Sequence, residues 1–336
     1  EELEKWKTGY YNPETGEDYR GFDWYDNFVS KAAPQSYVNI NINGGTDNTT
    51  YYLSVGHVNQ DAVFKDYNFN RTNMTANFNI DLTERLKVGA QVLGKIENRV
   101  NPALPGTDDY AEMRSSLYNL LPVWRPYAND NPDYLNFMAG HDAARNMAAY
   151  TIDNAGEFNQ VWRTIQPIFN IEYDIPIKGL KFKSLLSYYY ADKNTTDFEK
   201  GWKEYTYNST TKVYEIKYDR VDLGQTYLGK DTEHVEELTA QTYFDFDRTF
   251  SNVHQVTATV GLELYRRAWD RLYIYQSPAN NTFITMLTDC ENNKVVNNAL
   301  NYSTASWVFR AGYVYDQRYI IDFSSRYDAS WRFQKG

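Results

Sequence analysis

Apolar and polar residues alternate along most of the chain with the period of a β-strand. The runs 38–42 and 51–55 each carry an apolar residue at every second position. Successive side chains of a strand point to opposite faces, so each run predicts a strand with one apolar face and one polar face. The residues between them, NGGTDN at 43–48, favour a chain reversal. Together the two runs predict a β-hairpin.

The same pattern predicts four further hairpins, each made of two alternating runs and a short turn. Their turns lie near 83–85, 174–179, 247–252 and 315–318. Longer polar segments separate one hairpin from the next, near 60–71, 99–160, 193–232 and 268–301. Strict alternation of short and long connections is typical of transmembrane barrels, because every second connection of an antiparallel sheet returns to the same side.

The pattern therefore predicts an all-β protein, an antiparallel transmembrane β-barrel. About ten strands are legible, and most reach the length of about 9–11 residues that a tilted strand needs to cross a bilayer. We expect residues 36–336 to form part of the barrel, with long extracellular loops at 99–160, 193–232 and 268–301.

The faces of the wall can be predicted residue by residue. Even-numbered residues from Val256 to Leu262 should face lipid, and Gln255, Thr257 and Thr259 should face the lumen. Helical spacing of apolar residues at 109–121 predicts a short helix inside the first long loop.

Composition agrees with a wall that is apolar on one side only. Of the 336 residues 42% are apolar and 17% aromatic, yet the mean hydropathy is -0.68. No apolar run approaches the roughly 18 residues of a membrane-spanning helix. The net charge of -10 disfavours nucleic acid as a partner, because phosphate binding needs basic clusters. The single cysteine, Cys290, excludes an internal disulfide.

Two groups of residues form recognisable motifs. The first, near the N-terminus, is Trp24-Tyr25-Asp26, Gly44-Gly45, Tyr51-Tyr52, Gly56, Phe69-Asn70-Arg71, Asn77 and Val88-Gly89. The second, near the C-terminus, is Arg318-Tyr319, Ser324, Arg326, Asp328, Ser330, Arg332 and Phe333. Together they resemble the SusC/RagA-type TonB-linked outer-membrane transporters of Bacteroidetes, with departures from the family pattern at Ala329, Trp331 and Gln334. The resemblance covers nearly the whole chain.

The resemblance implies that the chain is a fragment of a larger protein. Residues 1–35 would then be the linker between an N-terminal plug and the barrel, and residues 36–336 would be the first part of that barrel. The N-terminus has no signal-peptide pattern. The family function would be active import of glycan or peptide oligomers across the cell outer membrane. Its partners would be a SusD-like surface lipoprotein, the TonB complex acting through the missing N-terminal region, and outer-membrane lipid.

Catalysis and metal binding find little support in the sequence. Of the histidines, His57, His141, His234 and His254, none lies in a zinc spacing or a nucleophile-elbow context, so we expect no catalytic residue and no enzyme activity. Oxygen ligands at Gly106–Asp109 and Asn129–Asp133 leave calcium in the extracellular loops as an alternative to solvated turns, although neither segment has the EF-hand pattern. We expect no resident metal and no other cofactor.

The long loops are rich in aromatic residues, which stack well on sugar rings and peptide side chains. We predict that the following contact the cargo or the lipoprotein lid: Trp124, Tyr127, Tyr134, Phe137, Trp202, Tyr205, Trp269 and Tyr273. The alternative is that such residues pack loops against each other or form the aromatic girdles of a barrel.

Two other classes of function stay open at this stage. A self-contained outer-membrane porin or barrel hydrolase would need this chain to be complete. A soluble, secreted glycan-binding β-protein would partition into water without detergent.

Overall fold

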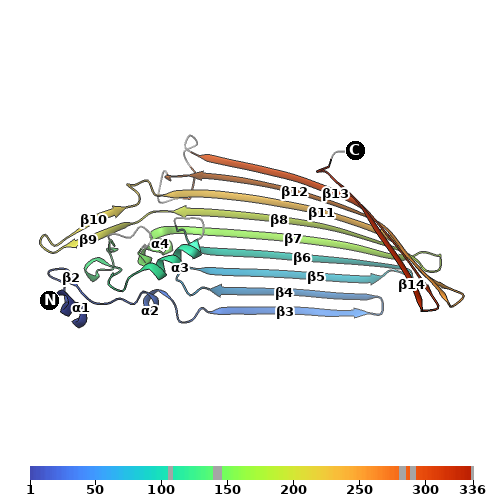
Figure 1. The fold of residues 1–336 in the computed structure, drawn as a ribbon, viewed down its shortest axis with the longest axis horizontal. Coiled ribbons are helices and arrows are strands. Elements are labelled where there is room, and N and C mark those ends of the chain that lie inside the picture. The colour runs from blue at the N-terminus through green and yellow to red at the C-terminus, as the bar shows by residue number, and fades with distance from the viewer. Residues whose placement is uncertain (105–108, 139–145, 280–284, 288–292, 334–336) are drawn as a thin grey trace.

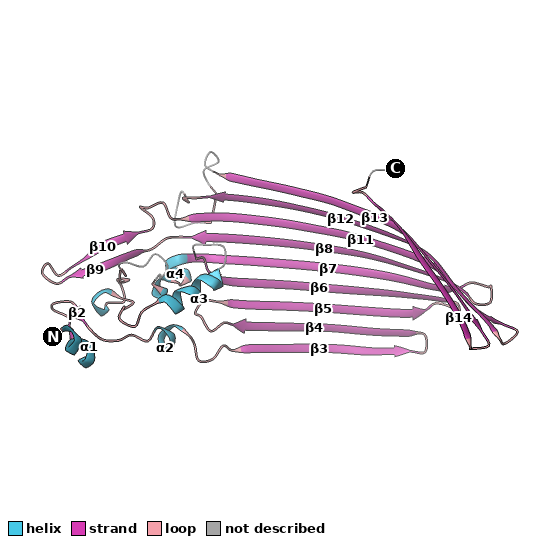
Figure 2. Ribbon diagram, viewed as in Figure 1, coloured by secondary structure: helices cyan, strands magenta, loops and turns pink. Residues whose placement is uncertain are grey.

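In the computed structural model, a single large antiparallel sheet dominates the fold (Figures 1 and 2). The structure describes residues 1–104, 109–138, 146–279, 285–287 and 293–333. The sheet has ten strands in the order β14-β13-β12-β11-β8-β7-β6-β5-β4-β3. These strands are β3 (Gln35–Thr46), β4 (Thr49–Asp61), β5 (Asn68–Asp81), β6 (Leu86–Pro102), β7 (Gly156–Asp174), β8 (Leu180–Glu199), β11 (Tyr227–Phe250), β12 (His254–Gln276), β13 (Lys294–Tyr315) and β14 (Tyr319–Ser330).

The remaining elements lie at the end of the sheet where the long connections are (Figure 1). We call this the loop end. They are α1 (Glu2–Thr8), β1 (Tyr11–Asn12), β2 (Glu17–Asp18), α2 (Trp24–Phe28), α3 (Asp109–Asn119), the 3₁₀ turns η1 (Ala128–Asp130) and η2 (Met147–Ala149), α4 (Ile152–Ala155), β9 (Lys203–Asn208) and β10 (Val213–Asp219). Within the described residues, no helix combines the length and the apolar character needed to cross a membrane.

All five predicted hairpins are present, and their register brings the apolar residues onto one face. Ile40 lies opposite Val55, and Val55 lies opposite Met74 on the next strand. Farther along the sheet, Phe244 lies between Phe182 and Val260. The register stays constant along each pair of neighbouring strands. The two side-chain faces of the sheet therefore remain distinct from β3 to β14.

The apolar face of the sheet is exposed in its middle part. On the inner strands Phe169 is 53% exposed, Leu186 45% and Phe244 46%. The face carries Val38, Ile40, Ile42, Leu53, Val55, Met74, Phe78, Ile165, Phe169, Ile171, Leu186, Leu238, Phe244, Val260, Leu264, Trp307, Phe309, Ile321 and Phe323. Soluble monomers rarely expose a contiguous apolar surface of this extent.

The opposite, polar face carries amides and ion pairs. Asparagines occupy every second position of the β3 run 39–43. Toward β14 ion pairs replace the amides: the Lys183 ammonium lies 3.0 Å from the carboxylate of Asp245, and the Arg326 guanidinium lies 2.6 Å from that of Glu263. The predicted alternation of faces is thus confirmed by the register.

The buried core lies beyond the sheet, among the loop-end elements. It contains Trp24, Val29, Phe64, Tyr67, Leu104, Met113, Leu120, Met138, Met147, Ala149, Tyr150, Ala155 and Trp202. A sandwich would bury a core between two sheets. In this chain the loops are the compact part, and one face of the sheet remains uncovered.

The strands are longer than the sequence predicted. The connections span 103–155, 200–226 and 277–293, in place of the predicted loops 99–160, 193–232 and 268–301. The prediction ended each strand where apolar alternation stops. Backbone pairing continues beyond that point through polar and charged residues, as in Asp231 opposite both Thr195 and Tyr273.

Residues 1–34 lie at the loop end and pack on the connection 103–155 (Figure 1). The indole N–H of Trp24 donates to the carbonyl of Leu121 at 3.1 Å. The backbone amide of Phe22 donates to the carbonyl of Pro122 at 2.7 Å. In structure the segment therefore belongs with the long connections. Its predicted role as a plug-to-barrel linker stays a prediction.

Candidate functional site

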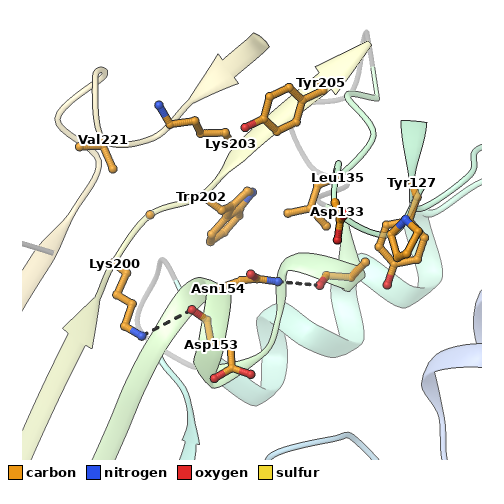
Figure 3. A pocket seen from close by; sticks show the side chains of 13 residues that line it. Tyr127, Asp133, Leu135, Asp153, Asn154, Lys200, Trp202, Lys203, Tyr205 and Val221 are labelled. Carbon is orange, nitrogen blue, oxygen red and sulfur yellow. Dashed lines mark hydrogen bonds between the residues drawn. The ribbon is translucent and has the colours of Figure 1, made fainter. Parts of the chain in front are cut away.

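A cavity of about 550 Å³ lies among the loop-end elements (Figure 3). Its walls come from four segments: the connection 103–155, the β8–β9 link, β9, and the β10–β11 link through Val221. The side chains that give it chemical character are Tyr127, Asp133, Asp153, Lys200, Lys203 and Tyr205. We call it the loop pocket.

The loop pocket forms because β9 docks on the connection 103–155. The amide of Tyr205 donates to the carbonyl of Leu135 at 2.7 Å, and the amide of Phe137 donates to the carbonyl of Tyr205 at 2.9 Å. Asn136 also forms a parallel bridge with Tyr205. Two segments about seventy positions apart are thereby joined by backbone hydrogen bonds.

The pocket presents charges of both signs. The Lys203 ammonium lies 2.8 Å from the carboxylate of Asp219. Burial would raise the pKa of the Asp219 carboxyl, but hydrogen bonds from Lys203 and from backbone amides outweigh it and lower the pKa. The carboxylates of Asp133 and Asp153 also line the pocket, and within the described part of the chain neither forms an ion pair.

Trp202 is held in place by its neighbours. Its indole N–H donates to Glu204 at 2.9 Å, the guanidinium of Arg220 lies 4.5 Å from its ring centre, and the ring of Tyr150 meets it edge-on at 6.0 Å. The side chain is 6% exposed. Trp202 thus forms a wall of the pocket, and Arg220 already covers a face of its ring.

Most of the other predicted aromatic residues in these loops also pack against protein. Tyr134 stacks on Tyr214 at 3.8 Å with an angle of 4° between the rings, and it meets Tyr205 edge-on at 5.0 Å. Trp124 packs against the buried core. Of the six predicted residues in the connections, Tyr127, Trp202 and Tyr205 line the loop pocket, while Trp124, Tyr134 and Phe137 do not.

Trp269 and Tyr273 lie elsewhere, on the polar face of β12. The rings of Tyr273 and Tyr275 stack with their centres 5.0 Å apart, and the hydroxyls of Tyr273 and Tyr227 are hydrogen-bonded to each other. The predicted site residues therefore divide between the loop pocket, the loop core and the sheet.

Sequence reasoning missed Asp153, Lys200 and Lys203 as pocket residues. No motif marks them, because they meet only after β9 has docked on the distant connection. The one available signal was the nearby pair Trp202 and Tyr205, which the aromatic criterion did select.

The other chemical candidates can be placed in part. Asp130, from the calcium candidate Asn129–Asp133, accepts hydrogen bonds from Arg20 and Arg125. Most of Gly106–Asp109, together with His141 and Cys290, lies outside the described residues. His234 contacts Asp192 at 3.3 Å.

We compared the chain with known proteins and structures. No protein-family model matches the chain. In sequence it is similar to the TonB-dependent receptor P39 of Formosa agariphila, with 21% identity over 318 residues, covering 91% of this chain and 27% of the relative. It is also similar to the TonB-dependent receptor P3 of the same organism, with 24% identity over 333 residues, covering 93% of this chain and 30% of the relative.

The solved structures decide the fold. The RagAB peptide importer in its closed-closed state matches 94% of this chain and 34% of the matched chain, with a TM-score of 0.70 and 19% identity. Its open-open state matches 94% and 33%, with a TM-score of 0.67 and 20% identity. The sheet has the fold of part of a TonB-dependent-transporter barrel. The antiparallel barrel predicted from the sequence is confirmed as this fold.

The chain spans about 27–30% of the length of the curated relatives that it matches. Those relatives are TonB-dependent receptors, not enzymes, in agreement with the expectation that this TonB-dependent-transporter-like chain is not an enzyme. They also come from the phylum to which the sequence resemblance pointed.

Proposed function

We propose that this chain forms part of the wall and the outer loops of an outer-membrane, TonB-dependent importer of glycan or peptide oligomers. The observation that carries the proposal is the exposed apolar face. A protein face on which residues of inner strands, such as Phe169 and Phe244, are about half exposed is stable only against lipid or another apolar surface.

The strand pairing meets the other requirement of a membrane wall inside the sheet. Each strand between β14 and β3 in the sheet order is hydrogen-bonded on both sides, as backbone groups in lipid must be, whereas β3 and β14 have one neighbour each and need further strands to close a barrel. Polar side chains, including the pairs Lys183–Asp245 and Arg326–Glu263, point away from the apolar face. We infer that this polar face lines the lumen.

The asymmetry of the connections supports one orientation. Short turns lie at one end of the sheet and the loop end at the other, as in barrels with short periplasmic turns and longer extracellular loops. We therefore assign the loop end, including residues 1–34 that pack on it, to the cell surface.

A partner protein at the cell surface fits the exposed side chains there. Tyr25 is 62% exposed and Tyr118 79%, and a cavity of about 640 Å³ opens between their segments, lined by Phe22, Leu117 and Leu120. Aromatic and aliphatic side chains of this kind dominate interface energetics. We propose that a SusD-like lipoprotein covers this surface and that TonB supplies the energy for uptake.

The experiment compares oligomer uptake in the source organism with and without the gene and with and without TonB. We expect uptake of one labelled oligomer class to fall to the same residual level in both mutants, and the protein to fractionate with the outer membrane. Uptake that persists without TonB would favour a passive porin.

A second arm tests the lid. Deletion of residues 103–150 should weaken co-purification of the lipoprotein and lower uptake, because α3 and the cavity beside it are lost. Unchanged association together with unchanged uptake would remove this connection from the mechanism.

A further inference from the structure

The polar face of β12 alternates aromatic and arginine side chains near the loop end. The residues are Tyr265, Arg267, Trp269, Arg271 and Tyr273, which share one face because they are spaced by two. We call them the β12 strip. At about 3.3 Å per residue the strip is about 26 Å long, so it can contact an oligomer.

The strip lies beyond the apolar face, toward the loop end. On the other side of the same strand the side chains are apolar through Leu264, and beyond it Arg266 and Asp270 interrupt the apolar face before Leu272 and Ile274. An aromatic girdle at the lipid interface points toward lipid. The strip points the other way, so a girdle does not account for it. In the proposed orientation it lines the mouth of the lumen.

Trp269 is the centre of this surface. Across the strands it lies between Val235 and Leu300, which give its ring apolar flanks. A cavity of about 500 Å³ is lined by Tyr265, Arg267, Trp269, Leu300, Tyr302 and Arg332. Among the described residues, no ring and no cation stacks on the indole of Trp269. Trp202, in contrast, has Arg220 and Tyr150 on its ring.

The arginines of the strip are already neutralised. Arg271 forms two hydrogen bonds with the carboxylate of Asp231, at 2.8 and 2.7 Å, and Arg267 lies 3.5 Å from the carboxylate of Glu237. These pairs have little remaining charge to attract an ionic cargo. They keep unused N–H donors and carboxylate lone pairs in fixed positions, which suits hydroxyl groups.

We propose that the β12 strip binds an uncharged carbohydrate oligomer, with one sugar ring stacked on Trp269, the next against the edge-on pair Tyr265 and Tyr302, whose ring centres lie 5.7 Å apart, and hydroxyls bonded to the arginine–carboxylate pairs. Aromatic faces beside preorganised polar groups are what a neutral sugar needs: apolar C–H faces and hydroxyls. This inference rests on the proposed function, within which it selects glycan over peptide.

Binding to the full-length protein in detergent tests the proposal by calorimetry. The probes are neutral hexasaccharides of glucose, mannose and galactose, a hexagalacturonate and an uncharged Gly/Ser heptapeptide. We expect at least one neutral hexasaccharide to bind, and Trp269→Ala to raise its Kd at least about tenfold, in line with the loss of a buried aromatic contact. Tyr302→Ala should weaken the same probe.

The matched control is Trp307→Ala. Trp307 lies on the next strand, is 47% exposed and faces the apolar side, so its loss should change the Kd by less than about twofold. Heat-modified gel mobility like that of the wild type shows that each variant still forms a barrel.

Several outcomes would overturn the proposal. They are binding of the peptide or the hexagalacturonate without any neutral hexasaccharide, absence of binding by all three neutral probes, and wild-type affinity in Trp269→Ala. The hexagalacturonate is a demanding comparison, because the guanidinium of Arg332 lies 5.8 Å from the ring of Tyr302 and attracts acidic sugars. A failure of the proposed function would give a different result. Uptake independent of TonB would contradict TonB-dependent import, whereas sugar binding at the strip would persist.

Discussion

Arg20 and Asp130 lie 110 positions apart in the sequence, yet Nη2 of Arg20 donates to Oδ2 of Asp130 at 2.7 Å. The same guanidinium binds Asp18 through two bonds, at 2.9 and 2.7 Å, and Arg125 binds Asp130 at 2.6 Å. Four charges therefore join the N-terminal segment to the connection 103–155. The ring of Tyr11 lies 3.7 Å from the guanidinium carbon of Arg20.

We predict that Arg20→Ala loosens the loop end without unfolding the sheet. Removal of the guanidinium leaves Asp130 with Arg125 alone and frees residues 1–34 from one of their attachments. Limited proteolysis should then cut the connection 103–155 several-fold faster. The matched control is Arg318→Ala, which removes an exposed pair with Asp316 at the opposite end of the sheet. Equal effects of the two variants would contradict the prediction.

The same network predicts a dependence on pH. Burial would raise the pKa of the Asp130 carboxyl, but hydrogen bonds from Arg125 and Arg20 outweigh it and lower the pKa below its ordinary value. A carboxyl with a lowered folded pKa stabilises the fold above its ordinary pKa of about 3.9, and this stabilisation is lost as the pH falls through the folded pKa.

Protection of the connection 103–155 against hydrogen exchange should therefore be level near neutral pH and fall only below about pH 4. Asp130→Asn should lower the protection at neutral pH and remove the acid-dependent step. A step of unchanged size in Asp130→Asn would assign it to another carboxyl.

The two faces of the sheet predict opposite tolerance to charge. Val260 is on the apolar face and 41% exposed, so Val260→Arg should lower the free energy of unfolding by about 2–4 kcal/mol near the middle of a bilayer. Thr259→Arg should cost less, because Thr259 is on the polar face and its hydroxyl lies 2.8 Å from the carboxylate of Asp245. Denaturant titration after refolding into lipid measures both. Equal losses would argue against a lipid-facing wall.

Gly156, at the start of β7, has φ 103 and ψ -172, a conformation that is essentially restricted to glycine. An added Cβ would lie 1.8 Å from the carbonyl oxygen of Phe198. Gly156→Ala should therefore destabilise the protein by about 1–3 kcal/mol or more. Gly21→Ala is the control, because nothing lies within 4 Å of its added Cβ and its φ is not positive. An equal loss of unfolding free energy in both variants would contradict the prediction.

The sheet could be predicted from the sequence because each strand carries its own signal. Alternating residues such as Val256, Val260 and Leu264 specify a strand, its two faces and its partner's register without knowledge of the rest of the chain. The strand ends could not be predicted in the same way. Beyond Leu264 the outward residue is Arg266, and no hydropathy pattern separates a polar strand from a loop.

The loop end was predicted less completely, because its structure depends on contacts between distant segments. Helical spacing did locate α3. Nothing in the sequence near Tyr205 indicates that it will bond to Leu135, or near Trp24 that it will reach Leu121. Aromatic content alone selected Trp202 as a contact for cargo, whereas Arg220 and Tyr150 occupy its ring.

The most direct test of the account is the side of the membrane on which each end of the sheet lies. Thr210, exposed at the tip of the β9–β10 hairpin, and Glu84, exposed in the turn between β5 and β6, are changed singly to cysteine in a background with Cys290→Ser. Intact cells of the source organism are then treated with a membrane-impermeant maleimide. The account predicts that Thr210→Cys is labelled on intact cells and that Glu84→Cys is labelled only after lysis. Labelling of Glu84→Cys on intact cells at the rate of Thr210→Cys would contradict it.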